Sequence, residues 1–269
     1  MKACLLLFAL LVLLLTISPL AACEGGEAYT EVCVDADPAA DTTIAWPWTE
    51  VNYADDEVLY VAEYCNLTSE RSKALLLFDL SHIQQGVTVT RAVLELFVEW
   101  LWASQSGVSV AVSVFSMDEA WDEECATWEM RTCSEEWSTP EDPGAAGAEE
   151  VARQVWSLGE ESPSEVWWRV NVTEAVAAWV RGERPNNGFM VEFTDVPSGV
   201  DAELVLASRE HGNESLHPRL RVCYLAGFSV SVSPQTVEVV QGGSAALRVQ
   251  VSPLGMPPGE FGRLRVEGL

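Results

Sequence analysis

Basic side chains are scarce in this chain of 269 residues. It has 15 lysines and arginines, of which only two are lysines, against 41 aspartates and glutamates, so its formal net charge at pH 7 is −26. Such a charge repels nucleic-acid phosphates and the headgroups of anionic lipids. We therefore expect no nucleic-acid partner, and we expect a membrane to hold the protein only through a covalent lipid anchor.

Sequence patterns typical of catalytic sites are also missing. The three histidines (82, 211 and 217) do not have the spacing of a metalloprotease site, and there is no nucleophile elbow, phosphate loop or dinucleotide fingerprint. No Cys-x-x-Cys occurs, so neither zinc nor thioredoxin-like chemistry is indicated. Among 41 acidic residues, the presence of two that could hydrolyse a glycoside carries no information. The sequence therefore predicts a protein that is not an enzyme.

The N-terminus has the features of a secretory signal. Lys2 precedes an apolar run from Leu5 to Ile17, and small residues follow. This pattern predicts a signal peptide at residues 1–22. Residues 20–23, Leu-Ala-Ala-Cys, resemble a lipobox, which predicts a lipid on Cys23, a tether at residues 23–30 and a place on the outer face of a prokaryotic membrane. Ordinary cleavage after Ala22, with Cys23 free to form a disulfide, is the alternative.

The cysteine count leaves this choice open. Seven cysteines are encoded and Cys4 leaves with the signal. If Cys23 carries lipid, five remain and one thiol is unpaired; otherwise six can form three disulfides. Cys125 and Cys133 are the first predicted pair, because they are close together in one polar segment. The second predicted pair is Cys33 with Cys223, because the first and last strands of a sandwich often meet.

The stretch from Ser72 to Ser81 predicts a central strand. Its sequence, SKALLLFDLS, is too short to span a bilayer and has no helical stripe. Ala74, Leu76, Phe78 and Leu80 share one face of a strand, while Leu75 and Leu77 make the other face apolar too. A strand that is apolar on both faces belongs in a sheet covered on both sides.

Other segments indicate an all-β domain with one short helix. Residues 91–102 alternate apolar side chains with glutamates, which is typical of a half-buried strand, and residues 118–147 form a long acidic segment with three tryptophans. Residues 173–181 predict the helix, with Asn171 as its N-terminal cap and Gly182 at its end. The expected core face of this helix consists of Val172, Ala175, Val176, Trp179 and Val180.

The residue pattern changes after Ala226-Gly227. Short Val-rich strands alternate there with Pro and Gly-Gly turns, and the segment looks like the opening of a bacterial or archaeal immunoglobulin-like repeat. A complete domain of that kind needs about a hundred residues. Residues 228–269 are therefore expected to be a partial immunoglobulin-like domain, either continued in a longer chain or completed by strands from elsewhere.

An ordered set of short motifs occurs at residues 40–44, 73–81, 89–94, 121–123, 127–128, 170–179, 187–189, 207–210 and 218–220. With these motifs the chain resembles the DNRLRE domain, which is grouped with carbohydrate-binding modules of alginate lyases and with archaeal disaggregatase-related surface proteins. The similarity covers about residues 28–225 and lacks the glycine usual near Asn52-Tyr53. The resemblance implies a jelly-roll-like antiparallel β-sandwich at residues 31–226 and non-catalytic glycan binding. The acidic, Cys-bridged insertion means that ligand specificity carried by loops does not transfer.

Four tryptophans are the predicted glycan-binding residues. Sugar rings are recognised by flat aromatic faces together with planar polar side chains. Trp46 and Trp48 flank Pro47 in a loop, and Trp100 and Trp102 point the same way on one strand. Packing in the core or at its rim is the alternative role for each of them.

Further candidate sites depend on loop residues. Asp35, Asp37 and Asp41 could supply oxygen ligands to a structural calcium ion, although solvated loop carboxylates are the commoner outcome in so acidic a chain. Asn66 and Asn213 begin glycosylation sequons in polar loops.

The sequence thus predicts a secreted, lipid-anchored cell-surface protein that binds polysaccharide or cell-surface glycan without catalysis. Two alternatives remain open. One is a structural envelope or adhesion protein with no sugar ligand. The other is the N-terminal part of a larger secreted enzyme acting on polysaccharide.

Overall fold

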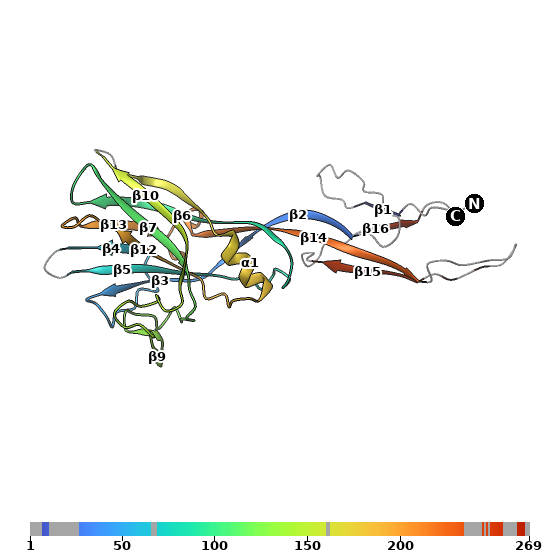
Figure 1. Ribbon diagram of the computed structural model, residues 1–269, viewed down its shortest axis with the longest axis horizontal. Helices are drawn as coiled ribbons and strands as arrows, with labels where there is room; N and C mark the ends of the chain where they lie inside the picture. The colour runs from blue at the N-terminus through green and yellow to red at the C-terminus, as the bar shows by residue number, and fades with distance from the viewer. Residues whose placement is uncertain are drawn as a thin grey trace.

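Strand follows strand through most of the chain, as the alternating apolar residues predict. The computed structural model describes residues 7–10, 27–65, 69–159, 162–233, 244, 246, 248–254 and 263–266 (Figure 1). Most of the predicted signal peptide, the lipobox with Cys23, and Asn66 lie outside these described residues. No helix among them is long and apolar enough to cross a membrane.

The described residues form sixteen strands, one α-helix and one short 3-10 helix. In chain order these are β1 (Leu7–Leu10), β2 (Glu27–Ala36), β3 (Pro38–Trp46), β4 (Val58–Glu63), β5 (Arg71–Phe78), β6 (Val89–Ala103), β7 (Val108–Ser116), β8 (Met130–Thr132), β9 (Glu135–Glu136), β10 (Glu149–Leu158), β11 (Ser164–Asn171), α1 (Thr173–Arg181), β12 (Phe189–Asp195), β13 (Ala202–Ala207), η1 (Glu214–Leu216), β14 (Arg219–Ser233), β15 (Arg248–Leu254) and β16 (Arg263–Val266).

Twelve of the strands form one large, curled antiparallel sheet. Its order is β10-β7-β12-β5-β4-β13-β6-β14-β15, with β3 beside β5, β11 beside β6 and β2 beside β14. The sheet curls so that its two halves enclose one large apolar core, to which strands from both halves contribute. The protein is therefore all-β and sandwich-like, as predicted. Strands β1 and β16 pair separately, and so do β8 and β9.

The central position of β5 is confirmed. It is bonded to β3 over its whole length, to β12 through Ala74–Leu76 and to β4 at its start. Ala74, Leu76 and Phe78 are buried in the main core, while Leu75 is buried on the opposite face in a second cluster. Both faces of the strand are therefore covered, which explains why both are apolar.

Residues 118–147, here called the capping loop, cover the outer face of β5. Trp121, Trp128 and Trp137 pack there with Leu75 and Met190. The Nε1–H of Trp137 donates to the carbonyl of Thr127 at 2.8 Å, so the most buried of these indoles is satisfied. A disulfide between Cys125 and Cys133 closes the loop, as predicted. The long polar segment thus has its own small core.

The helix α1 begins and ends at the predicted residues. Its predicted core face is buried, and Gly182 ends it in the left-handed conformation at φ 73°. The capping position itself differs from the prediction, because Val172 is the N-cap and Asn171 precedes it. The side chain of Asn171 nevertheless accepts hydrogen bonds from the backbone N–H and the hydroxyl of Thr173 at 3.1 and 2.7 Å. It therefore satisfies one free N–H of the first turn.

Strand β14 continues well beyond the predicted domain. It pairs with β6 through Arg219–Tyr224 and with β15 through Gly227–Ser233, so the predicted boundary near residue 227 falls inside an unbroken strand. Residues 27–30, predicted as the end of a tether, are strand residues of β2, because the extension of β14 offers them backbone partners. Figure 1 shows β2 and β14 running together out of the sandwich towards β15.

The predicted pair Cys33–Cys223 is present as a disulfide. The two residues are direct neighbours across β2 and β14, so the first strand of the sandwich is covalently joined to the last. Among the described cysteines, Cys65 alone is unpaired, and it is exposed.

Candidate functional site

A hollow of about 250 Å³ opens on the outer surface of the sandwich beside the ends of β3, β4 and β13. We call it the aromatic groove, because five aromatic side chains contribute to its wall. They come from β3, from the segment that follows it, and from β4 with the next residue. The wall residues used below are Trp46, Trp48, Tyr53, Tyr60, Tyr64, Arg71 and Glu203.

Strand periodicity explains why these residues meet. Tyr60, Ala62 and Tyr64 alternate along β4 and just past its end, so they project on the same side, and all three line the groove. Leu59 and Val61 point the other way into the main core. Strand β4 is therefore apolar inside and aromatic outside.

Trp100 and Trp102 extend this aromatic surface along β6. The indole Nε1–H of Trp100 donates to the Glu203 carboxylate at 3.2 Å, and Trp102 lies opposite Glu203 in the pairing of β6 with β13. Directly opposed residues of antiparallel strands project on the same face. All four predicted tryptophans are therefore grouped around the groove and the strands next to it.

These tryptophans are exposed to a degree unusual for their size. Their exposed fractions are 43% for Trp46, 50% for Trp48, 42% for Trp100 and 44% for Trp102, whereas Trp121, Trp128, Trp137, Trp168 and Trp179 are all at most 9% exposed. Five tryptophans are thus buried and four are exposed, while Trp156 and Trp167 have intermediate exposure. Packing in the core does not account for the exposed set.

Polar groups are set among the aromatic rings. The hydroxyl of Tyr64 donates to Glu203, and Arg71 pairs through Nε with Glu63 at 3.1 Å. Burial raises the pKa of Tyr64, and the hydrogen bond to Glu203 raises it further; burial likewise raises the pKa of Tyr53 and of Tyr60. The three phenols therefore stay protonated at neutral pH and can donate hydrogen bonds.

Sequence reasoning found the tryptophans but missed Tyr53, Tyr60, Tyr64 and Glu203. A signal was present for two of them, because Tyr60 and Tyr64 fall on one face of the strand that residues 58–64 predict. Glu203 could not be found in this way, since only the pairing of β13 with β4 and β6 brings it to the groove.

A second constellation, which we call the carboxylate cluster, joins Asp41, Glu123 and Glu210. One carboxylate oxygen of each lies within 4.8 Å of the others. Asp41 comes from β3, Glu123 from the capping loop and Glu210 from the segment after β13. Burial raises the pKa of Asp41 to about 8, the neighbouring carboxylates adding to this effect, and burial also raises the pKa of Glu123.

The calcium ligands predicted from sequence are not brought together. Asp35 and Asp37 are exposed, and Asp35 lies 4.0 Å from Arg221, whereas Asp41 is buried. The partners of Asp41 are instead Glu123 and Glu210, which lie 82 and 169 positions further along the chain. Both partners belong to motifs that carry the family resemblance, so the sequence did contain a signal that could have identified them.

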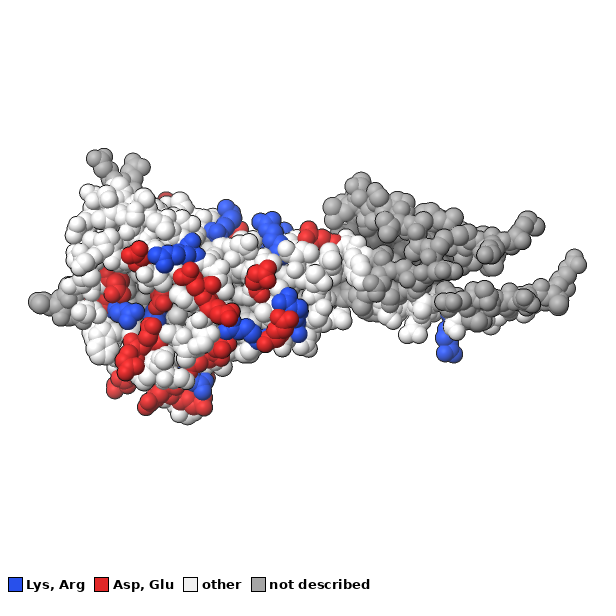
Figure 2. Space-filling view, in the orientation of Figure 1, with Lys and Arg blue, Asp and Glu red and all other residues white. Residues whose placement is uncertain are grey.

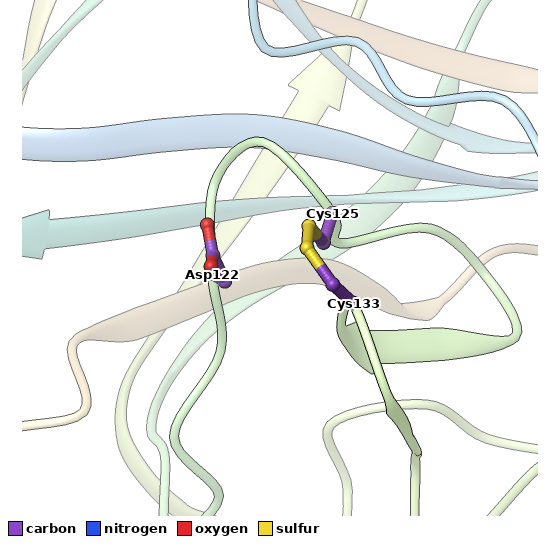
Figure 3. A group of neighbouring side chains, drawn as sticks. All are labelled: Asp122, Cys125 and Cys133. Carbon is purple, nitrogen blue, oxygen red and sulfur yellow. A yellow bond between two sulfur atoms is a disulfide. The ribbon is translucent and has the colours of Figure 1, made fainter.

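A third group, Asp122 with Cys125 and Cys133, is not a metal site. Figure 3 shows the two cysteines joined by their disulfide at the base of the arch that begins near Asp122. A metal ion binds thiolates, and both sulfurs are here oxidised. The disulfide in this group has a structural role, because it closes the capping loop.

The remaining predicted residues stay separate from these sites. Asn213 is exposed, and its Oδ1 accepts from the N–H and the hydroxyl of Ser215, which caps η1. A further hollow of about 400 Å³ beside α1 is lined by Glu149, Glu150, Glu174 and Arg184 and by no exposed aromatic ring.

Figure 2 shows acidic and basic side chains interspersed over one face of the sandwich. An all-β sandwich with an exposed aromatic groove defines a class of β-sandwich module. Within that class, the family model described as the disaggregatase related repeat domain matches residues 49–222. The chain belongs to this family, which confirms the disaggregatase-related part of the predicted resemblance. None of the curated proteins matches the chain significantly.

Proposed function

We propose that this protein is a non-catalytic glycan-binding module and that the aromatic groove is its binding site. The observation that carries the proposal is the grouping of four half-exposed tryptophans around a groove that three tyrosines also line. Exposed apolar surface costs solubility, so its concentration in one place calls for a binding role.

The chemistry of the groove suits a sugar chain. Indole and phenol rings pack against the C–H faces of pyranose rings, and the Tyr hydroxyls, Glu203 and Arg71 offer donors and acceptors to sugar hydroxyls. The acidic surface repels uronates and sulfated sugars, since the whole chain carries a net charge of −26. A neutral polysaccharide or cell-surface glycan is therefore the ligand class that we infer.

Tryptophan substitution tests this function. We expect Trp46→Ala and Trp100→Ala each to weaken binding to a neutral polysaccharide about tenfold or more, which corresponds to about 1.4 kcal/mol. The ligand is first chosen on an array of neutral and anionic glycans, and affinities are then measured by titration calorimetry. The matched control is Tyr29→Ala, because Tyr29 is an equally exposed aromatic residue on β2, at 50%.

Three results would contradict the proposal. If the wild-type protein binds no glycan on the array, a structural envelope or adhesion role without a sugar ligand takes its place. If Tyr29→Ala weakens binding as much as Trp46→Ala, the ligand does not depend on the groove. Release of reducing ends from a bound polysaccharide would instead favour a role in polysaccharide cleavage.

We also propose that the module acts at the cell surface, secreted by its signal peptide and held on the membrane by lipid at Cys23. The support is the order of Lys2, the apolar run and the Leu-Ala-Ala-Cys sequence. Mass spectrometry of the mature N-terminus after expression in a lipoprotein-processing host should show a diacylglyceryl mass on Cys23. An unmodified Cys23 would remove the anchor and leave a secreted protein.

A further inference from the structure

The carboxylate cluster contains buried oxygens that the protein leaves without a partner. Asp41 is only 1% exposed, and its Oδ2 accepts from the backbone N–H of Arg209 at 2.9 Å, but its Oδ1 has no hydrogen-bond donor. The Oε2 atom of Glu210 is also buried and without a hydrogen-bond partner, although the side chain as a whole is 23% exposed. Buried polar atoms of this kind are rare, because an unsatisfied atom loses its hydration without gaining a compensating hydrogen bond.

Arg209 supplies the nearest positive charge, and it does not complete the cluster. Its guanidinium lies 3.2 Å from Glu123 and 2.6 Å from Glu210. One guanidinium faces three carboxyl groups, so two negative charges remain when all three are ionised. The guanidinium contacts neither of the two oxygens that lack partners, Asp41 Oδ1 and Glu210 Oε2.

The spacing of the oxygens suits one cation. Calcium binds oxygen ligands at about 2.3–2.6 Å, so two oxygens on the same ion are at most about 5 Å apart. The cluster oxygens lie within 4.8 Å of one another. Magnesium requires shorter, nearly octahedral bonds and gives up its water reluctantly, so it fits a site made only of protein carboxylates less well.

We propose that Asp41, Glu123 and Glu210 bind a divalent cation, with calcium preferred over magnesium. The ion joins three segments that are far apart in sequence: β3, the capping loop and the turn after β13. The backbone already brings them together, because the N–H of Asp41 donates to Glu123 at 2.7 Å. Bound calcium therefore fastens the capping loop to the sandwich. The site is separate from the aromatic groove and does not depend on its function.

Calcium titration of the chelator-treated wild-type protein is the direct test. We expect calorimetry with CaCl₂ to give one site per chain, MgCl₂ to bind at least tenfold more weakly, and CaCl₂ to raise the melting temperature. Asp41→Asn should weaken calcium binding at least tenfold. The matched control is Asp35→Asn, which makes the same change of charge on an exposed aspartate of β2 and should leave the affinity unchanged.

A second variant, Glu210→Gln, keeps the test decisive if Asp41→Asn does not fold, and it should also weaken calcium binding at least tenfold. Absence of calcium binding by the wild-type protein overturns the proposal and assigns the oxygens to a carboxyl pair that shares a proton. Calcium binding that both cluster variants retain, or that Asp35→Asn loses equally, also overturns it.

Discussion

Lys73 is the only lysine outside the predicted signal peptide, and the fold buries it completely. Its exposed fraction is 1%, and its Nζ lies 2.5 Å from Asp142, 2.8 Å from Glu192 and 3.0 Å from the carbonyl of Pro143. It stands on the outer face of β5, where the alternate residue Leu75 packs under the capping loop. A charge at this position is expensive to bury, so its partners decide whether it stabilises the protein.

Removal of this charge should be costly. We expect Lys73→Met to lower the free energy of unfolding by about 3–5 kcal/mol, because it leaves Glu192, whose side chain is 14% exposed, as a buried charge without a counterion. Urea denaturation measures the loss. The double variant Lys73→Met with Glu192→Met should recover much of it, since an apolar pair of similar volume can replace a buried ion pair.

An exposed ion pair provides the control for this prediction. Arg153 lies 3.5 Å from Asp195, and both side chains are more than 40% exposed. Arg153→Met should cost no more than about 1 kcal/mol. Equal losses for Lys73→Met and Arg153→Met would mean that the buried pair contributes nothing particular to stability.

At the scale of elements, local periodicity was sufficient for β5 and α1. Alternation over Ala74–Phe78 predicts a strand covered on both sides, and the stripe from Val172 to Val180 predicts the helix and its buried face. Such patterns are readable because the side-chain periods of strands and helices are fixed by backbone geometry. The start of β2 could not be predicted in this way, because residues 27–30 form a strand only through pairing with β14.

The two candidate sites also differ in whether local sequence could predict them. Four tryptophans could be selected from exposure arguments about one loop and one strand. The carboxylate cluster could not, because Asp41, Glu123 and Glu210 meet only after β3, the capping loop and the turn after β13 are placed in three dimensions. Asp35 and Asp37 are nearer to Asp41 in sequence, but they are exposed and do not belong to the cluster.

At the scale of the whole molecule, the two disulfides constrain very different lengths of chain. Cys33 and Cys223 are 190 residues apart, whereas Cys125 and Cys133 are 8 apart. The entropy lost by the unfolded chain grows with loop length, and the chain-entropy estimate is about 5 kcal/mol for the first bond and about 2.5 kcal/mol for the second. The bond between β2 and β14 should therefore dominate global stability.

Paired serine variants test this ranking. We expect Cys33→Ser with Cys223→Ser to lower the free energy of unfolding by more than Cys125→Ser with Cys133→Ser does, as measured by guanidinium denaturation. Both are made in a Cys65→Ser background, so that the exposed free thiol cannot exchange with either disulfide. An equal or reversed ranking would show that the capping loop, rather than the closure of the chain, limits stability.

The uninterrupted course of β14 has a mechanical consequence. Tension applied to the chain beyond residue 233 is transmitted along this strand into the sandwich, where β6 holds it by backbone hydrogen bonds and Cys33 holds it covalently. Because the pull is parallel to the strand, the bonds between β14 and its neighbours are loaded together in shear and do not open one after another. Loading in shear resists a pull better than loading that opens the bonds in sequence.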